Sequence, residues 1–151
     1  MARALVALLF ASAAPLVAAP VPKALKNSPT LEGKWVTTER HVGGSDMTAS
    51  PWVWEVKGTN LHTFARQRDG TLTPDFTDDR ITLSAPDAAR PTEIDYLYVS
   101  GNQKILWRGL MKWDGEEFVI CFGEQEKDRP AEVKNDRSVY SYYRFKRLAD
   151  K

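Results

Sequence analysis

The stretch "WRGLMKWDGEEFVICF", residues 107–122, decides the fold of this chain. Two runs of alternating apolar and polar residues flank Asp114-Gly115. This dipeptide favours a two-residue hairpin turn, because both residues tolerate a positive φ. The stretch therefore predicts two antiparallel strands joined by a tight turn, and the position of the turn sets a register between them.

A turn centred on Asp114-Gly115 predicts which residues face each other. Lys112 is expected opposite Glu117, and Arg108 opposite Cys121. A nearby cation lowers the pKa of a thiol, so one interpretation gives Cys121 a reactive role; the other makes it a small apolar strand residue. The core face of this hairpin is predicted to hold Trp107, Gly109, Met111, Phe118, Ile120 and Phe122, with Gly109 leaving local space beside Trp107.

The same alternation recurs along the chain on both sides of the hairpin. No window keeps an apolar stripe at helical spacing, so the fold class is all-β. Strand 93–99 leaves two alternatives open, with either Ile94, Tyr96 and Tyr98 or the intervening residues facing inward. In the last strand, Val139, Tyr143 and Phe145 are expected on one side. The predicted strands are 33–42, 52–57, 60–67, 80–84, 93–99, 104–113, 116–122 and 138–147.

Mostly short connections predict that consecutive strands are antiparallel neighbours. An open sheet of this kind would expose two edges that can pair with other copies, and closure removes both edges. We therefore expect an eight-stranded antiparallel up-and-down barrel. Barrels of this size are either filled by side chains or hold one small ligand.

The opening "LEGKW" places Gly33 two residues before Trp35 at the head of the first strand. This resembles the G-x-W motif of lipocalins, in which the indole plugs the closed end of the barrel. The resemblance implies that a basic residue of the last strand lies across the indole. Arg147 matches that role best and Arg144 second.

Three ordered segments extend the resemblance over most of the chain: "LEGKW", "WDGEEFVICFGEQEKDRPAEV" and "YRFKR". Together they resemble an uncharacterised lipocalin-like domain family that is expanded in planctomycete bacteria. The resemblance implies a lipocalin-like barrel without an assigned activity.

The N-terminus has the form of a secretory signal peptide, residues 1–19, with Arg3 followed by an apolar run and small residues. A retained N-terminal anchor is the alternative, although the run is short for a membrane span. Residues 20–30 are predicted to form a linker and residues 31–148 the barrel domain. We expect an exported protein, periplasmic or extracellular, without an integral membrane span in the mature chain.

Charge and cysteine content narrow the function. The chain has 21 basic and 20 acidic side chains, and loss of Arg3 with the signal peptide leaves 20 of each. A neutral domain without a basic block is not expected to bind nucleic acid. Cys121 is the single cysteine, so an internal disulfide is excluded.

No catalytic constellation is visible, and no metal or cofactor is expected. His41 and His62 do not stand in ligand-spaced motifs, and the carboxylate pairs Asp78-Asp79 and Glu116-Glu117 suit solvated turns. We expect non-covalent binding of a small apolar or aromatic ligand in the cell envelope. The residues expected to line its site are Trp54, Tyr96, Trp107, Phe118, Phe122 and Tyr143, with Trp52 from the same aromatic set.

Loops 43–51 and 85–91 are expected to border the open end of the barrel. The charged stretch 123–137 is interpreted as a long solvated loop or a short helix over one end of the barrel, and its functional alternative is a lid or partner surface. The alternative function is a filled barrel that acts as a protein-interaction or structural module of the envelope. An enzyme using Cys121 or a carboxylate is a third hypothesis.

Overall fold

The computed structural model describes residues 30–75, 80–84, 92–135 and 139–149. The predicted signal peptide and nearly all of the predicted linker lie outside these ranges. The described residues form strands without helices, so no helix among them has the length and apolarity that a membrane crossing requires. The strands are β1 (Gly33–Val42), β2 (Ser45–Asp46), β3 (Trp52–Lys57), β4 (Asn60–Arg66), β5 (Leu72–Pro74), β6 (Arg80–Ser84), β7 (Glu93–Ser100), β8 (Gln103–Asp114), β9 (Glu117–Phe122) and β10 (Ser141–Arg147).

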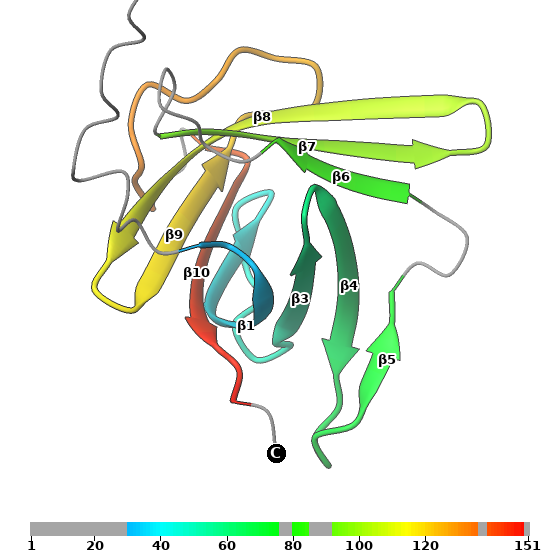
Figure 1. The fold of residues 1–151 in the computed structure, drawn as a ribbon. Helices are drawn as coiled ribbons and strands as arrows, with labels where there is room; N and C mark the ends of the chain where they lie inside the picture. Colours follow the sequence, from blue (N-terminus) through cyan, green and yellow to red (C-terminus); the bar gives the residue numbers. More distant parts are fainter. Residues whose placement is uncertain (1–29, 76–79, 85–91, 136–138, 150–151) are drawn as a thin grey trace, which may run out of the picture.

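Eight of these strands form a closed antiparallel barrel within the described part of the chain (Figure 1). The order around the barrel is β1, β3, β4, β6, β7, β8, β9 and β10, so sequence neighbours are spatial neighbours. Pairing of β10 with β1, from Trp35–Arg147 to Val42–Ser141, closes the sheet. The short strands β2 and β5 add to β1 and β4 outside this circuit. The predicted up-and-down barrel is confirmed, and its architecture is lipocalin-like.

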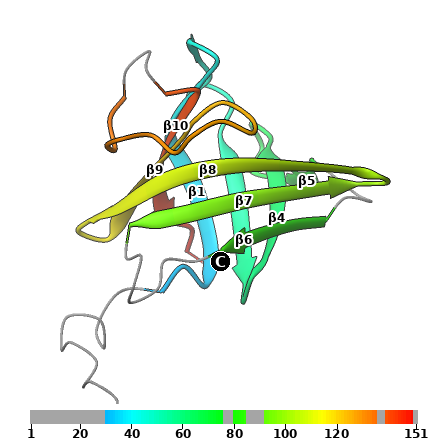
Figure 2. The ribbon, with the colours of Figure 1, turned by 90° about the horizontal axis from the view of Figure 1, so that it is seen from above.

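The hairpin of β7 and β8 is the longest ribbon of the barrel, and Figure 2 shows it reaching past the neighbouring strands. Its register runs without interruption from Glu93–Leu110 to Ser100–Gln103. Along β7, Ile94 and Tyr96 are buried in the core. This decides the alternative that the sequence left open for this strand.

The predicted register of the β8–β9 hairpin is wrong by two residues. The turn is formed by Gly115-Glu116, so Asp114 pairs with Glu117. Gly115 has a φ of 65°, and a positive φ at the first central position alone is the signature of a type II′ turn. A shift of two residues keeps every side chain on its predicted face, because the side-chain period of a strand is two.

The corrected register changes the partners of the polar residues. Lys112 pairs with Val119 rather than Glu117, and Cys121 pairs with Leu110 rather than Arg108. The predicted cation opposite the cysteine is therefore absent from the β8–β9 pairing. The space expected beside Gly109 is also taken, since a Cβ atom there would lie 2.5 Å from the ring of Phe122.

The beginning of the last strand differs from the prediction as well. β10 starts at Ser141, and Val139 packs on the outside with Cys121 and Tyr142 rather than on the side of Tyr143. Residues 136–138, which the predicted strand partly included, lie outside the described ranges. From Ser141 onward the inward and outward alternation follows the expectation.

The barrel interior is packed solidly toward the end where β1 begins and β10 ends. Phe118 lies at the centre of this region, with its ring 4.7 Å from that of Trp35 and 4.9 Å from that of Phe145. Trp113 closes the cluster at 5.3 Å from Phe118. We call this half of the barrel the closed end.

Candidate functional site

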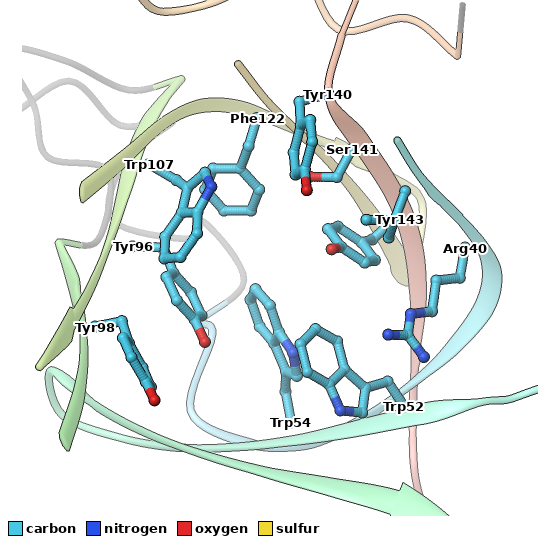
Figure 3. Close-up of a pocket in the computed structure, with 11 residues that line it drawn as sticks. Arg40, Trp52, Trp54, Tyr96, Tyr98, Trp107, Phe122, Tyr140, Ser141 and Tyr143 are labelled. Carbon is cyan, nitrogen blue, oxygen red and sulfur yellow. The ribbon is translucent and has the colours of Figure 1, made fainter. Parts of the chain in front are cut away.

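The opposite half of the barrel contains a hollow of about 360 Å³, which we call the open-end pocket (Figure 3). Its size falls within the range of small-molecule sites in proteins. Its walls come from strands spread around the barrel, and the side chains converge on a common space. The lining residues are Arg40, Val42, Trp52, Trp54, Tyr96, Tyr98, Trp107, Phe122, Tyr140, Ser141 and Tyr143.

Aromatic rings in this pocket brace one another around the hollow. The rings of Tyr96 and Trp107 meet edge to face with centroids 5.3 Å apart. Trp54 lies 6.2 Å from both Tyr96 and Tyr143. Edge-to-face and offset contacts of this kind are favourable, and they fix the rings in place. The result is a preformed aromatic wall suited to flat or apolar molecules.

Five of the six residues predicted to line a ligand site surround the open-end pocket: Trp54, Tyr96, Trp107, Phe122 and Tyr143. Phe118 does not, because it lies fully buried in the closed end. The predicted position of Phe118 was wrong. Phe118 faces inward like Phe122, but it lies four residues earlier on β9, in the other half of the barrel. Trp52, from the wider aromatic set, also lines the pocket.

Arg40 reaches the pocket because β1 contains a β-bulge. Thr37 pairs with Phe145 and Glu39 with the next residue of β10, Arg144, so Thr38 is an extra residue without a partner opposite. A bulge reverses the alternation of the residues that follow it. Trp35 and Arg40, five positions apart, therefore both face the interior.

Neighbouring groups hold the Arg40 side chain in a defined position. Its guanidinium carbon lies 4.5 Å from the centroid of the Trp52 ring. Its Nη1 atom donates a hydrogen bond to the carbonyl of Ser50 at 3.2 Å. Stacking on an indole and bonding to a carbonyl together fix a positive charge at the mouth of the pocket. Regular alternation from Trp35 would have placed Arg40 outside, so the sequence pattern missed it.

Hydrogen-bond donors without acceptors gather in the residues of this wall. The Nε atom of Arg40 and the indole nitrogens of Trp52 and Trp54 are buried and have no partner among the described residues. Folded proteins pair the large majority of such atoms. Deeper in the wall, burial raises the pKa of the Tyr143 hydroxyl, while a hydrogen bond from Ser141 acts in the opposite direction.

The closed end shows the arrangement that the G-x-W resemblance implied. The guanidinium carbon of Arg147 lies 4.3 Å from the centroid of the Trp35 ring, and the indole nitrogen donates to the carbonyl of Leu31 at 2.7 Å. Gly33 has a φ of 107°, and a Cβ atom there would lie 2.7 Å from Nη1 of Arg147. Arg144, the second choice for this role, lies on the outer surface instead.

The sequence predicted that loops 43–51 and 85–91 border the open end. Residues 43–51 join β1 to β3, whose pocket residues Val42 and Trp52 lie at the mouth. Residues 85–91 lie outside the described ranges. The expectation for that loop stays a prediction.

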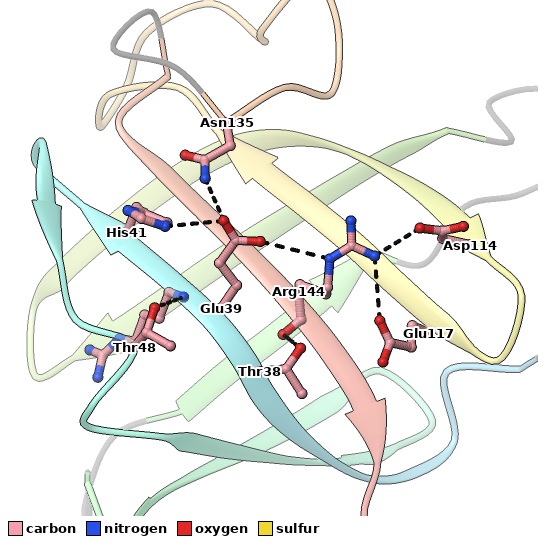
Figure 4. A network of polar contacts seen from close by, with 9 residues as sticks. Thr38, Glu39, His41, Thr48, Asp114, Glu117, Asn135 and Arg144 are labelled. Carbon is pink, nitrogen blue, oxygen red and sulfur yellow. Dashed lines mark hydrogen bonds and ion pairs between the residues drawn. The ribbon is translucent and has the colours of Figure 1, made fainter.

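The outer wall carries a polar network rather than a site facing the pocket (Figure 4). Arg144 contacts Asp114 at 2.8 Å, Glu117 at 3.3 Å and Glu39 at 3.7 Å. His41 lies 3.2 Å from Glu39, which also accepts a hydrogen bond from Asn135. These contacts tie β1, β9 and β10 to the loop that follows β9. We assign them a structural role.

Cys121 lies on the same outer wall, under the described part of loop 123–137. Its thiol donates to the carbonyl of Glu132 at 3.4 Å, and it is fully buried. Arg129 holds this loop to β7 through ion pairs of 3.1 Å with Glu93 and 2.8 Å with Asp95. The described part of this loop thus covers the side of the barrel, and these contacts do not place it over the mouth as a lid.

Histidine and carboxylate side chains do not converge on a metal-binding geometry. His62 is exposed on β4, opposite Glu55. Across the ranges that the structure describes, no group of three or more His, Cys, Asp or Glu side chains is placed to hold a metal ion. The pair Asp78-Asp79 lies outside those ranges.

Comparison with known proteins adds no functional assignment. No family model, curated protein or solved structure matches the chain.

Proposed function

We propose that this chain is an exported, lipocalin-like binding protein that holds a small apolar or aromatic molecule in the open-end pocket without reacting with it. The single observation that carries the proposal is the hollow of about 360 Å³ walled by aromatic rings. The form of residues 1–19 supports export, and the ordered motifs support the resemblance to the planctomycete lipocalin-like domains.

Binding in this pocket would be driven by removal of apolar surface from water. Each large apolar group that the rings bury fully would contribute about 1.5–3 kcal/mol. Because the rings are already braced against one another, little side-chain freedom remains to be lost on binding. The hollow also argues against the alternative of a barrel filled throughout.

A cavity-filling substitution tests the proposal directly. Val42 lines the pocket from β1, so Val42→Trp places a further indole in the hollow. His62→Trp adds the same indole to the exposed face of β4 and serves as the matched control. Binding of the neutral probe N-phenyl-1-naphthylamine is measured by fluorescence titration, with circular dichroism and thermal unfolding to check the fold.

We expect the wild type and His62→Trp to bind the probe with affinities within a factor of two, and Val42→Trp to bind at least tenfold more weakly. Native mass spectrometry of protein purified from its own host should show a bound small molecule in the wild type and less of it in Val42→Trp. Equal probe binding by all three folded proteins would overturn the proposal.

A further inference from the structure

The charge of the open-end pocket is unbalanced. Of the described residues that line it, Arg40 is the charged one, and the others are aromatic, aliphatic or hydroxyl-bearing. In the described part of the chain no carboxylate lies within 4.0 Å of its guanidinium nitrogens, the distance that defines an ion pair. Arg40 thus has no direct ion-pair partner in that part of the chain, and a ligand anion would supply one.

Asp75 is an acidic residue whose charge interacts with that of Arg40, but the two do not form an ion pair within 4.0 Å. Partial burial raises the pKa of the Asp75 carboxyl, and the charge of Arg40 opposes this rise without cancelling it. Asp75 lies just after β5, and its backbone bonds to Thr63. Asp75 is therefore not a direct partner of the Arg40 guanidinium, and a ligand carboxylate would be one.

Hydrogen-bond donors without acceptors also favour an anionic ligand in this pocket. Arg40 Nε and the two indole nitrogens of Trp52 and Trp54 belong to adjoining parts of β1 and β3, and these atoms have no acceptor among the described residues. A ligand oxygen that reaches this part of the wall would meet donors that the protein itself leaves without an acceptor. A carboxylate accepts hydrogen bonds from several donors at once, and charge-assisted bonds of this kind are the strong ones.

We propose that the occupant of the open-end pocket is an apolar or aromatic carboxylic acid, with its carboxylate against Arg40 and its apolar part between Trp54, Tyr96 and Trp107. This inference rests on the proposed binding function and adds the chemical class of the ligand. Arg40 selects the acid by charge, and the aromatic wall supplies affinity that is independent of charge.

Matched ligand pairs separate these two contributions. We would measure binding of 2-naphthoate and of 2-naphthalenemethanol, which has the same rings without the charge, by isothermal titration calorimetry. A small panel of further acids with neutral alcohol twins covers other shapes. The proteins are the wild type, Arg40→Met, Arg40→Lys and the control Lys146→Met, which removes one positive charge from an exposed position on β10.

We expect the wild type and Lys146→Met to bind the acids at least tenfold more tightly than the alcohols. Arg40→Met should lose about tenfold in affinity for the acids while its affinity for the alcohols stays within a factor of two. Arg40→Lys, which keeps the charge, should retain part of the preference. Thermal unfolding and circular dichroism check that each variant is folded.

Two results would overturn the inference, and they differ from each other. Equal affinity for acids and alcohols, unchanged in Arg40→Met, would remove the acid from the proposal and leave the binding function in place. Absence of binding for both members of every pair would overturn the binding function and the ligand class together.

Discussion

Both halves of the barrel are lined by aromatic side chains, but one half is packed and the other contains a pocket. At the closed end, the ring of Phe118 packs against those of Trp35 and Phe145 with centroids 4.7 and 4.9 Å apart. At the open end, Trp54 and Tyr96 stand 6.2 Å apart around a pocket of about 360 Å³. The aromatic content therefore does not decide whether a barrel is filled; the position of each ring along its strand does.

This comparison also explains how a small barrel can tolerate a hollow. Ring packing supplies burial at the closed end, and the β1–β10 pairing closes the sheet along its whole length, so the open end can leave surface uncovered. We expect stability to be concentrated in the closed end and binding in the open end.

The largest expected effect is a loss of stability from truncation in the closed end. Phe118→Ala removes a fully buried ring and should lower the free energy of unfolding by about 3–5 kcal/mol. Trp107→Ala removes a larger but partly exposed ring that faces the pocket, and should cost less than half as much. Urea unfolding at 25 °C measures both. Equal losses of unfolding free energy in the two variants would contradict this division between the two ends.

A smaller loss of stability is expected at the rim of the closed end, around Gly33 and Arg147. Gly33→Ala forces a side chain onto a positive φ and should destabilise the fold by about 1–3 kcal/mol. Arg147→Ala removes the cation over Trp35, a loss of about 0.5–1 kcal/mol for an exposed contact.

The double variant Gly33→Ala/Arg147→Ala sharpens this prediction. The added Cβ atom would collide with Nη1 of Arg147, so removal of that side chain should relieve part of the cost of Gly33→Ala. Unfolding free energies of the four proteins form a double-mutant cycle. Strict additivity would show that the glycine is required for its φ alone.

The smallest effect concerns the outer wall beside the closed end and depends on pH. Hydrogen bonding to Arg144 lowers the pKa of the Asp114 carboxyl. A lowered pKa in the folded state gives stability that is present above the unfolded-state pKa of 3.8 and is lost as the pH falls through the folded value. The stability difference between wild type and Asp114→Asn should therefore be larger at pH 6 than at pH 2.5. A difference that does not change with pH would contradict this linkage.

Periodicity alone predicted much of the fold. Alternation around Phe118, Ile120 and Phe122 placed the right side chains inside, even though the turn lies one residue later than Asp114-Gly115. An error of two in register leaves the faces unchanged, so the pattern could not detect it. The register of this hairpin depends on contacts with another strand, because Asp114 and Glu117 face each other and both contact Arg144 of β10.

The candidate site was less accessible to sequence reasoning. A local pattern predicts which face of the sheet a residue occupies, but not its position along the barrel axis. For that reason Phe118 was predicted to line the pocket together with Phe122. Arg40 was missed because its direction depends on pairing with β10, about a hundred residues later in the chain. No local signal in the first strand marks Thr38 as the extra residue.

The extra residue in β1 has a consequence for how this protein can change in length. Loss of one residue usually turns the remainder of a strand inside out. Between Trp35 and Arg40, however, a shortened chain would have an even spacing, and an uninterrupted ladder would still present both side chains to the interior. This segment of β1 is therefore suited to the loss of one residue. Elsewhere in the barrel, the same deletion would turn inward-facing residues to the outside and outward-facing residues to the inside.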